Sequence, residues 1–408
     1  MRTVWQDGRA RRMLGAILMS SLAFGLNVLA LGQVLFQLTG STQAFVSVVA
    51  SQGAGAICVL PFCGPVVDAL SSTRVYITAA LGKASCVLAI VGITSMRLGD
   101  PVPFILAAAV LLAVFDNVER AALFKFTAHH VGKEGVVQFN AVTGMVFQAG
   151  VVVGMALLGV VLAYGSPVGA LLVSAGSSAV CAGIASRIRT VVPERTQPLS
   201  VAMLRSAVLG LLGDWRRMFG QYRRELVVFA MVVTCAADFL FANSLSTLVV
   251  PLVDEFYGRQ SWYVSALEAT FGIGMITASF FTSRTARQKL LPFWLAVQAG
   301  IALVLSCTAV PAVHFAAFLT AGFANLNSLV WLLSSLQQHA GDGDKAKMAS
   351  LRLLAIGLGS VVLMPSVGQA AKTSLSAGFV SVSVIMLVFA VGSIWPAVRF
   401  RPGAAVSR

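Results

Sequence analysis

The sequence predicts an all-α membrane protein with twelve transmembrane helices in two pseudo-symmetric six-helix bundles and with both termini in the cytoplasm. Three observations predict this class. The chain is 58% hydrophobic and only 11% charged, it contains twelve long apolar runs, and its basic residues gather in alternate loops. The runs are continuously apolar and lack the two-residue alternation of a membrane β-barrel, so we interpret them as helices.

The composition excludes an ordinary soluble domain, which carries about 25% charged residues. The net charge of +14 could suggest a nucleic-acid partner. However, the basic residues lie in short loops between apolar runs and do not form a stripe along one face. We therefore expect a lipid bilayer around the chain and no nucleic acid.

A helix needs about 20 apolar residues to cross about 30 Å of hydrocarbon. The predicted spans, in chain order, are 14–38, 43–67, 75–96, 102–124, 138–163, 167–187, 226–253, 260–283, 290–310, 312–337, 349–371 and 374–397. The first of these runs is too long for a signal-peptide core, so we expect it to remain as a spanning helix.

The orientation follows from the lysines and arginines in the loops. If the N-terminus is cytoplasmic, only Arg97, Arg259 and Lys372 fall on the opposite side, and Lys83 and Arg352 fall inside spans. All the other basic residues are then cytoplasmic. This asymmetry predicts a multi-pass protein with both termini inside the cell.

The longest polar interval follows the sixth span and divides the chain into three parts. We expect an N-terminal bundle over 1–188, a cytoplasmic linker over 189–225 and a C-terminal bundle over 226–408. In the linker, Leu204, Val208 and Leu211 begin an apolar series at helical spacing, with arginines around it. This pattern favours an amphipathic helix on the inner leaflet over a plain soluble linker helix.

The six cysteines and four histidines show no ligand spacing, so we expect buried free thiols, no metal site and no cofactor. The chain also contains no metal triad, no G-x-S-x-G sequence and no soluble catalytic domain. We therefore do not expect an enzyme.

The segment GPVVDALSSTR, residues 64–74, gives the architecture a family resemblance. Gly64, Asp68 and the later cation Arg74 resemble the loop motif between spans two and three of the major facilitator superfamily, although the motif's Arg, its second Gly and the next basic position are absent. In span five, Gly150, Gly154 and Gly159 resemble an exporter motif of that superfamily, with Met155 in place of its Pro. Glycines four apart also let two helices approach closely.

Two further likenesses point to different subgroups of this superfamily. Residues 115–142 and 348–362 resemble bacterial exporters of drugs, macrolides and siderophores. Residues 61–83 also resemble bacterial lysophospholipid transporters, including Lys83 in span three. Those proteins carry an acid before the first-span asparagine, whereas Leu26 precedes Asn27 here.

The charged residues inside the spans are the candidates for coupling or substrate binding, because a charge at mid-membrane costs roughly 2.5–3.5 kcal/mol. They are Asp238 in span seven, Asp116 in span four, Glu268 in span eight and Lys83 in span three. Glu119 and Arg120 follow Asp116 on the same helix face and are gating candidates. For Asp116 and Arg120 a structural ion pair is the alternative, and for Lys83 an acid partner or an anionic substrate are both open. The neutral polar candidates are Asn27, Gln148 and Asn243.

The resemblance also implies a gate. In the family, the motif's Asp meets the start of span eleven, whose free N–H groups favour a negative charge. We expect Asp68 to do so here and Arg352 to supplement it.

These observations predict a secondary active transporter that exports a small amphipathic organic molecule, such as a drug, natural product or siderophore. We expect alternating access, proton-coupled antiport, a monomer and a bacterial inner-membrane location. The alternative is a lysophospholipid flippase in which Lys83 contacts the phosphate. A sensor or scaffold without transport is a further possibility.

Overall fold

The computed structural model describes residues 8–39, 62–95, 100–131, 135–164, 166–188, 226–258, 262–341 and 344–399, together with a few isolated positions. Within these ranges the regular structure is helical throughout and contains no strand. Ten of the described helices are long and apolar enough to cross a membrane. Most of the predicted second span and of the amphipathic linker lie outside the described residues.

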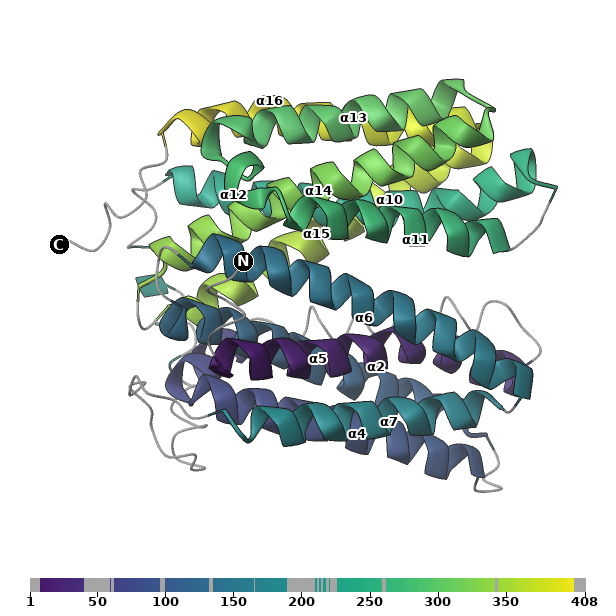
Figure 1. Cartoon of the computed structure of the whole chain (residues 1–408), viewed down its shortest axis with the longest axis vertical. Coiled ribbons are helices and arrows are strands. Elements are labelled where there is room, and N and C mark those ends of the chain that lie inside the picture. Colours follow the sequence, from purple (N-terminus) through teal and green to yellow (C-terminus); the bar gives the residue numbers. More distant parts are fainter. Residues whose placement is uncertain are drawn as a thin grey trace. The chain divides into compact units, whose positions relative to one another are not determined.

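Each predicted span except the second coincides with a described helix (Figure 1). Their bounds are α2 Gly8–Thr39, α4 Ser72–Ser95, α5 Val102–His130, α6 Val136–Tyr164, α7 Pro167–Ala185, α10 Leu226–Phe256, α11 Trp262–Ser279, α13 Leu291–Cys307, α14 Pro311–His339, α15 Lys345–Thr373 and α16 Leu375–Arg399. Two short helices, α12 Thr282–Thr285 and η1 Gln288–Leu290, lie between α11 and α13. Residues 62–69 are helical and include the end of the second predicted span.

Several helices begin where the local sequence predicts. Proline occupies the first turn of α5, α7, α13 and α14, where its missing N–H removes no intrahelical bond. The Ser166 side chain also accepts a hydrogen bond from the Gly169 N–H and caps α7. Several spans therefore start at a local signal as well as at an apolar run.

The chain forms two compact units. Unit 1 comprises residues 1–132, 146–214 and 342–350, and unit 2 comprises 133–145, 215–341 and 351–408. The units follow the two halves of the chain except that each contains a short segment from the other half. Helices α6 and α15 therefore begin in one unit and continue in the other.

In unit 1, α2 packs on α7, and α4 packs on α5 and α7. The core between these helices contains Leu26, Leu31, Val87, Ile105 and Leu171, all of which are almost fully buried. Close helix approach requires glycine at several positions. A Cβ on Gly150 would overlap Ser21, and one on Gly154 would lie 2.5 Å from the Leu22 carbonyl oxygen. The predicted role of these glycines in helix packing fits these contacts, whereas the surroundings of Gly159 lie outside the described set.

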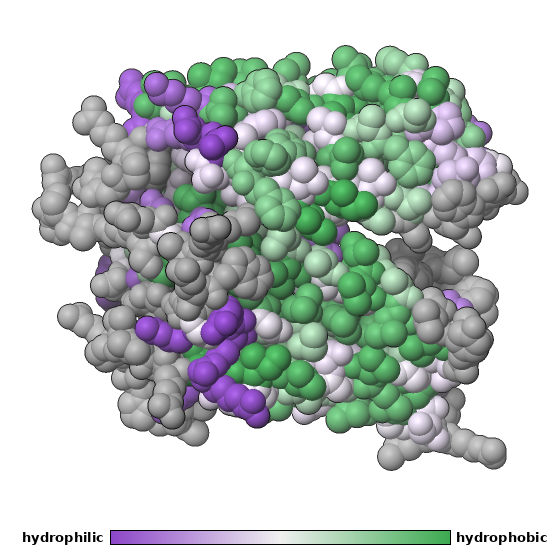
Figure 2. Space-filling model, in the orientation of Figure 1, coloured by the Kyte–Doolittle hydropathy of each residue, from purple (hydrophilic) through white to green (hydrophobic). Residues whose placement is uncertain are grey.

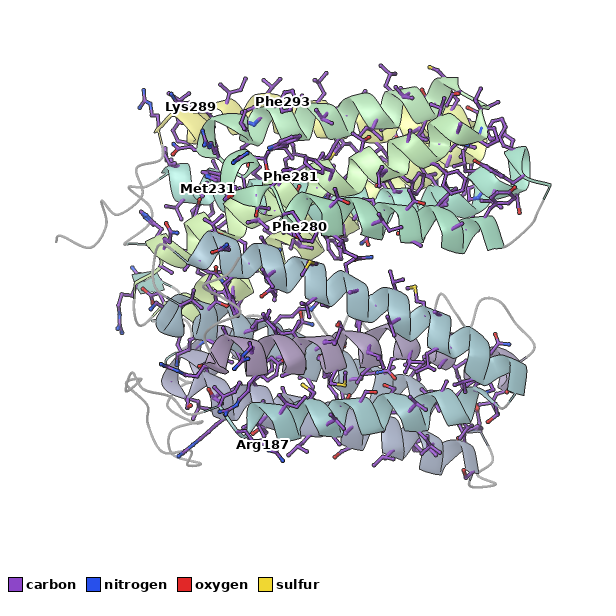
Figure 3. All side chains as sticks on the ribbon, in the orientation of Figure 1. Arg187, Met231, Phe280, Phe281, Lys289 and Phe293 are labelled. Atoms are coloured by element: carbon purple, nitrogen blue, oxygen red, sulfur yellow. The ribbon has the colours of Figure 1, made fainter. Side chains whose placement is uncertain are left out.

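In unit 2, α13 packs on α16 and α14, α11 packs on α14, and α10 packs on α16 and α14. Large apolar side chains cover the outside of the helices, and hydrophilic residues gather toward the helix ends on the face shown in Figure 2. Lys289 and Phe293 lie on the outside of this unit in Figure 3, and Phe293 is 53% exposed. Such an apolar exterior suits contact with lipid.

Candidate functional site

A buried charge cluster centred on Lys83 lies in unit 1. Lys83 on α4 is 3% exposed, and its Nζ lies 3.1 Å from an Asp116 oxygen and 2.5 Å from a Glu119 oxygen, both on α5. Lys83 also donates to the Ser20 hydroxyl on α2 at 2.8 Å, and Ser20 donates to Glu119 at 2.5 Å. We call Ser20, Lys83, Asp116 and Glu119 the lysine cluster.

The positive charge of Lys83 is neutralised within the lysine cluster. The Nζ of Lys83 donates a hydrogen bond to Ser20 and forms ion pairs with Asp116 and Glu119. The structure therefore supports the acid-partner interpretation of Lys83 over a role in binding an anionic substrate. Two carboxylates share one ammonium, so these three ionised groups carry one net negative charge.

Arg120 does not form the ion pair with Asp116 that the sequence left as an alternative. Its guanidinium lies over the rings of Phe24 and Phe147, 5.6 and 5.9 Å from their centroids, and no ion pair of Arg120 is present in the described part of the chain. Asp116 and Arg120 share a face of α5, but the ion-pair partner of the Asp116 carboxylate is Lys83 from α4. Such cation–π contacts contribute about 0.5–2 kcal/mol.

A cavity of about 50 Å³ opens beside the lysine cluster. Its wall is formed by Ile17, Ser20, Phe24, Tyr76, Asp116, Glu119, Arg120, Leu123 and Phe147. One side is aromatic and apolar, and the other carries the acids. The cavity has room for a few water molecules but not for an organic substrate, which needs several hundred Å³.

Unit 2 contains a second buried polar cluster, around Asp238 on α10. Its Oδ1 accepts hydrogen bonds from Ser328 Oγ at 2.5 Å and from Gln298 Nε2 at 3.2 Å. Gln298 also donates to Ser328 at 3.0 Å, and Asn325 donates to the Asp238 carbonyl at 2.8 Å. Arg352 on α15 lies beside Cys235 on α10 and acts on Asp238 electrostatically. Its predicted role beside Asp68 stays a prediction.

Asp68 contacts the beginning of α15. Its two carboxylate oxygens accept hydrogen bonds from the N–H groups of Ala346 at 2.7 Å and Lys347 at 2.9 Å. These N–H groups belong to the first turn of α15, where a carboxylate is stabilised. A Cβ on Gly64 would lie 2.6 Å from Lys347 Cα, so this approach requires glycine. We call Gly64, Asp68, Ala346 and Lys347 the latch.

Asp68 lies just after the second predicted span, and the pKa of its buried carboxyl group is raised. Burial raises its pKa from 3.8 to about 7. The N–H groups of Ala346 and Lys347 and the charges of Lys347 and Lys125 lower this pKa, but they offset the desolvation only in part.

Lys125 on α5 is the functional candidate that the sequence analysis missed. It is 1% exposed, and its Nζ donates to the carbonyls of Val67, Asp68 and Leu70 at 3.1, 2.9 and 2.5 Å. These carbonyls end the helix that carries Asp68, where a cation is favourable. The orientation argument places Lys125 among the cytoplasmic basic residues. Its position between Phe124 and Phe126 was the available signal that its side chain is buried.

The other sequence candidates lie apart from these clusters. Glu268 is half-buried next to Ser246. Asn27 is buried, and its side-chain oxygen has no hydrogen-bond partner. Gln148 and Asn243 are half-buried, whereas Arg74 is exposed on α4.

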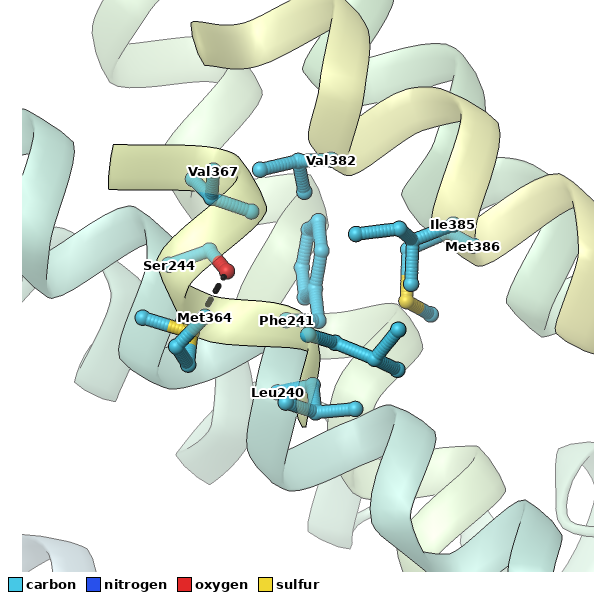
Figure 4. Close-up of a pocket in the computed structure, with 9 residues that line it drawn as sticks. Leu240, Phe241, Ser244, Met364, Val367, Val382, Ile385 and Met386 are labelled. Atoms are coloured by element: carbon cyan, nitrogen blue, oxygen red, sulfur yellow. Dashed lines mark hydrogen bonds between the residues drawn. The ribbon is translucent and has the colours of Figure 1, made fainter. Parts of the chain in front are cut away.

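A narrow apolar gap in unit 2 is lined by residues of α10, α15 and α16 (Figure 4). Ser244 donates to the Met364 sulfur at 3.4 Å across it, and Phe241 and Met386 form part of the wall. The gap is too narrow for a water molecule, so it has no room for a ligand in this conformation.

Comparison with known proteins identifies the architecture. The family model described as Major Facilitator Superfamily matches residues 13–364. A search of curated proteins found no match.

Solved structures show the same fold over 96% of the chain. A bacterial homologue of the iron transporter ferroportin in the outward-facing state is 14% identical, with 99% of that chain covered and a TM-score of 0.78. The human organic anion transporter MFSD10 (TETRAN) is 16% identical, with 99% covered and a TM-score of 0.72. The transporter FucP in the outward conformation is 14% identical, with 99% covered and a TM-score of 0.70. At these identities the likeness concerns the fold alone.

Proposed function

Because the chain belongs to the major facilitator superfamily, we propose that it exports a small amphipathic organic molecule by alternating access in exchange for protons. The direction of transport and the type of substrate rest on the resemblance of residues 115–142 and 348–362 to drug, macrolide and siderophore exporters. The proposal includes a monomeric protein in a bacterial inner membrane.

The cavity beside the lysine cluster is the observation that carries this proposal. Phe24 and Phe147 provide an apolar side, whereas Asp116 and Glu119 provide a charged side. A molecule with both an apolar and a polar part fits such a wall. The present volume of about 50 Å³ requires that the cavity widens during transport.

The lysine cluster also offers a site for proton exchange. Lys83 balances the charge of one carboxylate, so a proton on the other leaves a neutral group of residues. Asp116 is the more accessible acid, with its side chain 22% exposed, whereas that of Glu119 is 8% exposed. Asp116 is therefore the acid that exchanges protons in this proposal.

The latch supplies the conformational step. Asp68, just after the second predicted span, contacts the first turn of α15 from the other half of the chain. In the proposed cycle these bonds hold one conformation and must break before the other forms.

Transport into proteoliposomes with a panel of fluorescent amphipathic cations and neutral dyes tests the proposal. We expect Asp116→Asn to abolish accumulation driven by a proton gradient, while passive exchange of dye continues. Asp254→Asn, which changes an exposed acid at the end of α10, is the matched control and should leave accumulation unchanged. Full gradient-driven accumulation by Asp116→Asn would exclude Asp116 as the coupling acid.

No observation favours the alternative of lysophospholipid flipping, because the charge of Lys83 is already paired with Asp116 and Glu119. The same proteoliposomes, loaded with labelled lysophospholipid, provide the comparison. Flipping that is abolished by Lys83→Gln and is insensitive to a proton gradient would replace export with this alternative.

A further inference from the structure

The carboxyl group of Asp238 has an asymmetric environment. Both of its hydrogen-bond donors, Ser328 Oγ and Gln298 Nε2, point to Oδ1, whereas Oδ2 is buried and has no partner. An ionised carboxylate has two equivalent oxygens, and each needs donors when it is buried. In a carboxylic acid the two oxygens differ, since one is a carbonyl that accepts and the other is a hydroxyl that donates. The observed arrangement is that of the acid.

A second buried oxygen without a partner belongs to Gln298, whose amide already contacts Asp238. Gln298 directs its Nε2 to Asp238, and its Oε1 is buried without any partner. Gln298 is 0% exposed and Asp238 is 2% exposed, so water does not satisfy these atoms freely. One proton on Asp238 Oδ2 turns the two unpaired acceptors into a donor and an acceptor. A carboxylic acid and an amide can pair through two complementary hydrogen bonds.

The charged groups around Asp238 argue against a metal cation at this position. Arg352 on α15 is the nearest cation, and its Nε is also buried without a partner, but it forms no ion pair with Asp238. A metal ion would have to bind close to this guanidinium. Cys235 is the titratable neighbour on α10 itself.

The helices packed against α10 add no other charge to the middle of the site. The titratable residues of α14 are His314 and His339 near its two ends, α13 has Cys307 at its end, and α16 has Arg399 in its last turn. Helix α11 has Tyr263 near its start and Glu268, which contacts Ser246 two turns away from Asp238. The site therefore consists of one acid, a neutral amide, two neutral hydrogen-bonding residues and one arginine that forms no ion pair with the acid.

We propose that Asp238 and Gln298 form a proton-binding site in unit 2, in which Asp238 carries a proton on Oδ2 and donates it to Gln298 Oε1. Release of this proton to water leaves a carboxylate, and Arg352 is the cation placed to balance it. A proton and the Arg352 guanidinium thus compete for the same acid. The role of this site in coupling rests on the proposed function, whereas the proton itself does not.

Infrared spectroscopy of the purified full chain tests the proton directly. We expect the wild type to show a carboxylic-acid C=O band at neutral pH that is lost in Asp238→Asn and kept in Asp254→Asn. In Gln298→Leu the band should remain and shift in frequency, because its hydrogen-bond acceptor is lost. Asn at position 238 still offers a carbonyl and a donor, so this variant should fold with an apparent Tm close to that of the wild type.

Two outcomes would overturn the proposal. One is a spectrum at neutral pH in which all bands lost in Asp238→Asn belong to an ionised carboxylate. The other is a carboxylic-acid band that disappears on addition of Na⁺ or K⁺ at constant pH, which would identify a metal-cation site. A wild type that carries the band but transports no dye would refute the proposed export and leave the proton site intact.

Discussion

Lys125 binds the end of the helix that carries Asp68 of the latch. The family motif places basic residues directly after its Asp, and this chain has Ala69 and Ser72 there. Lys125 reaches the same helix end from α5 and caps three of its carbonyls. The missing cation is therefore supplied from a different helix.

Lys125→Met should destabilise unit 1 by about 2 kcal/mol, because three buried or partly buried carbonyls lose a charged donor. The apparent Tm in detergent measures this change. Lys289→Met replaces an exposed lysine and should leave the apparent Tm unchanged. Equal stability of the two variants would show that Lys125 contributes nothing to the latch.

Gly64→Ala should weaken the latch by about 1–3 kcal/mol, since a Cβ there meets the Lys347 backbone, which cannot rotate away. Faster hydrogen exchange at the amides of Ala346 and Lys347 is the readout. Gly92→Ala on α4 is the control, because nothing lies within 4 Å of its Cβ position. Unchanged exchange in Gly64→Ala would contradict the close approach.

The latch should also depend on pH through Asp68. Its pKa is about 7 when it is buried and 3.8 ordinarily, so the latched conformation binds the proton more tightly. Its stability is then greatest below pH 3.8 and decreases as the pH rises through about 7. Protection of the Ala346 and Lys347 amides, corrected for intrinsic exchange, should fall between pH 3.8 and about pH 7 and stay level at higher pH. Asp68→Asn should remove this dependence, and a wild type with constant protection would contradict it.

At the scale of helices, the close pairing of α2 with α6 depends on Gly150 and Gly154. Gly154→Leu should prevent this packing and reduce the yield of folded protein, as judged by size-exclusion chromatography in detergent. Gly176→Leu on α7 has open space around the new side chain and should behave like the wild type. A normal elution profile for Gly154→Leu would show that the two helices are free to separate.

Helix existence was predictable because each span is a continuous apolar run, and the described bounds differ from the predicted ones by a few residues in most spans. The partners of the polar side chains were not predictable. Asp116 and Arg120 share a helix face, but the packing of α4 on α5 brings Lys83 to Asp116. The sequence did not identify Gln298 and Ser328 as partners of Asp238. A neutral polar residue in a span becomes informative only when its neighbour from another helix is known.

At the scale of the whole molecule, the two units do not coincide with the two halves of the chain. Asn140 from the first half is buried in unit 2, where it donates to Ser334 at 2.9 Å and to Gln337 at 2.5 Å. Residues 342–350 from the second half belong to unit 1 and contain the partners of Asp68. Each half therefore completes the unit of the other.

Expressed alone, residues 1–200 or 201–408 should be unstable, because each half lacks one of these segments. Expressed together in one cell, the two pieces should co-purify. Fluorescence-detected size-exclusion chromatography of a tagged half, with and without its partner, measures both results. A tagged half that elutes as a single stable species alone would show that the exchanged segments are dispensable.

This exchange of segments also constrains how such proteins are recombined. A chimera joined in the linker between the sixth and seventh spans keeps every helix of each parent. It nevertheless places Asn140 and Asp68 against foreign residues, so compatibility depends on two short segments far from the junction. If residues 133–145 and 342–350 are transplanted together with the unit that contains them, the contacts of Asn140 and those of Asp68 each come from a single parent.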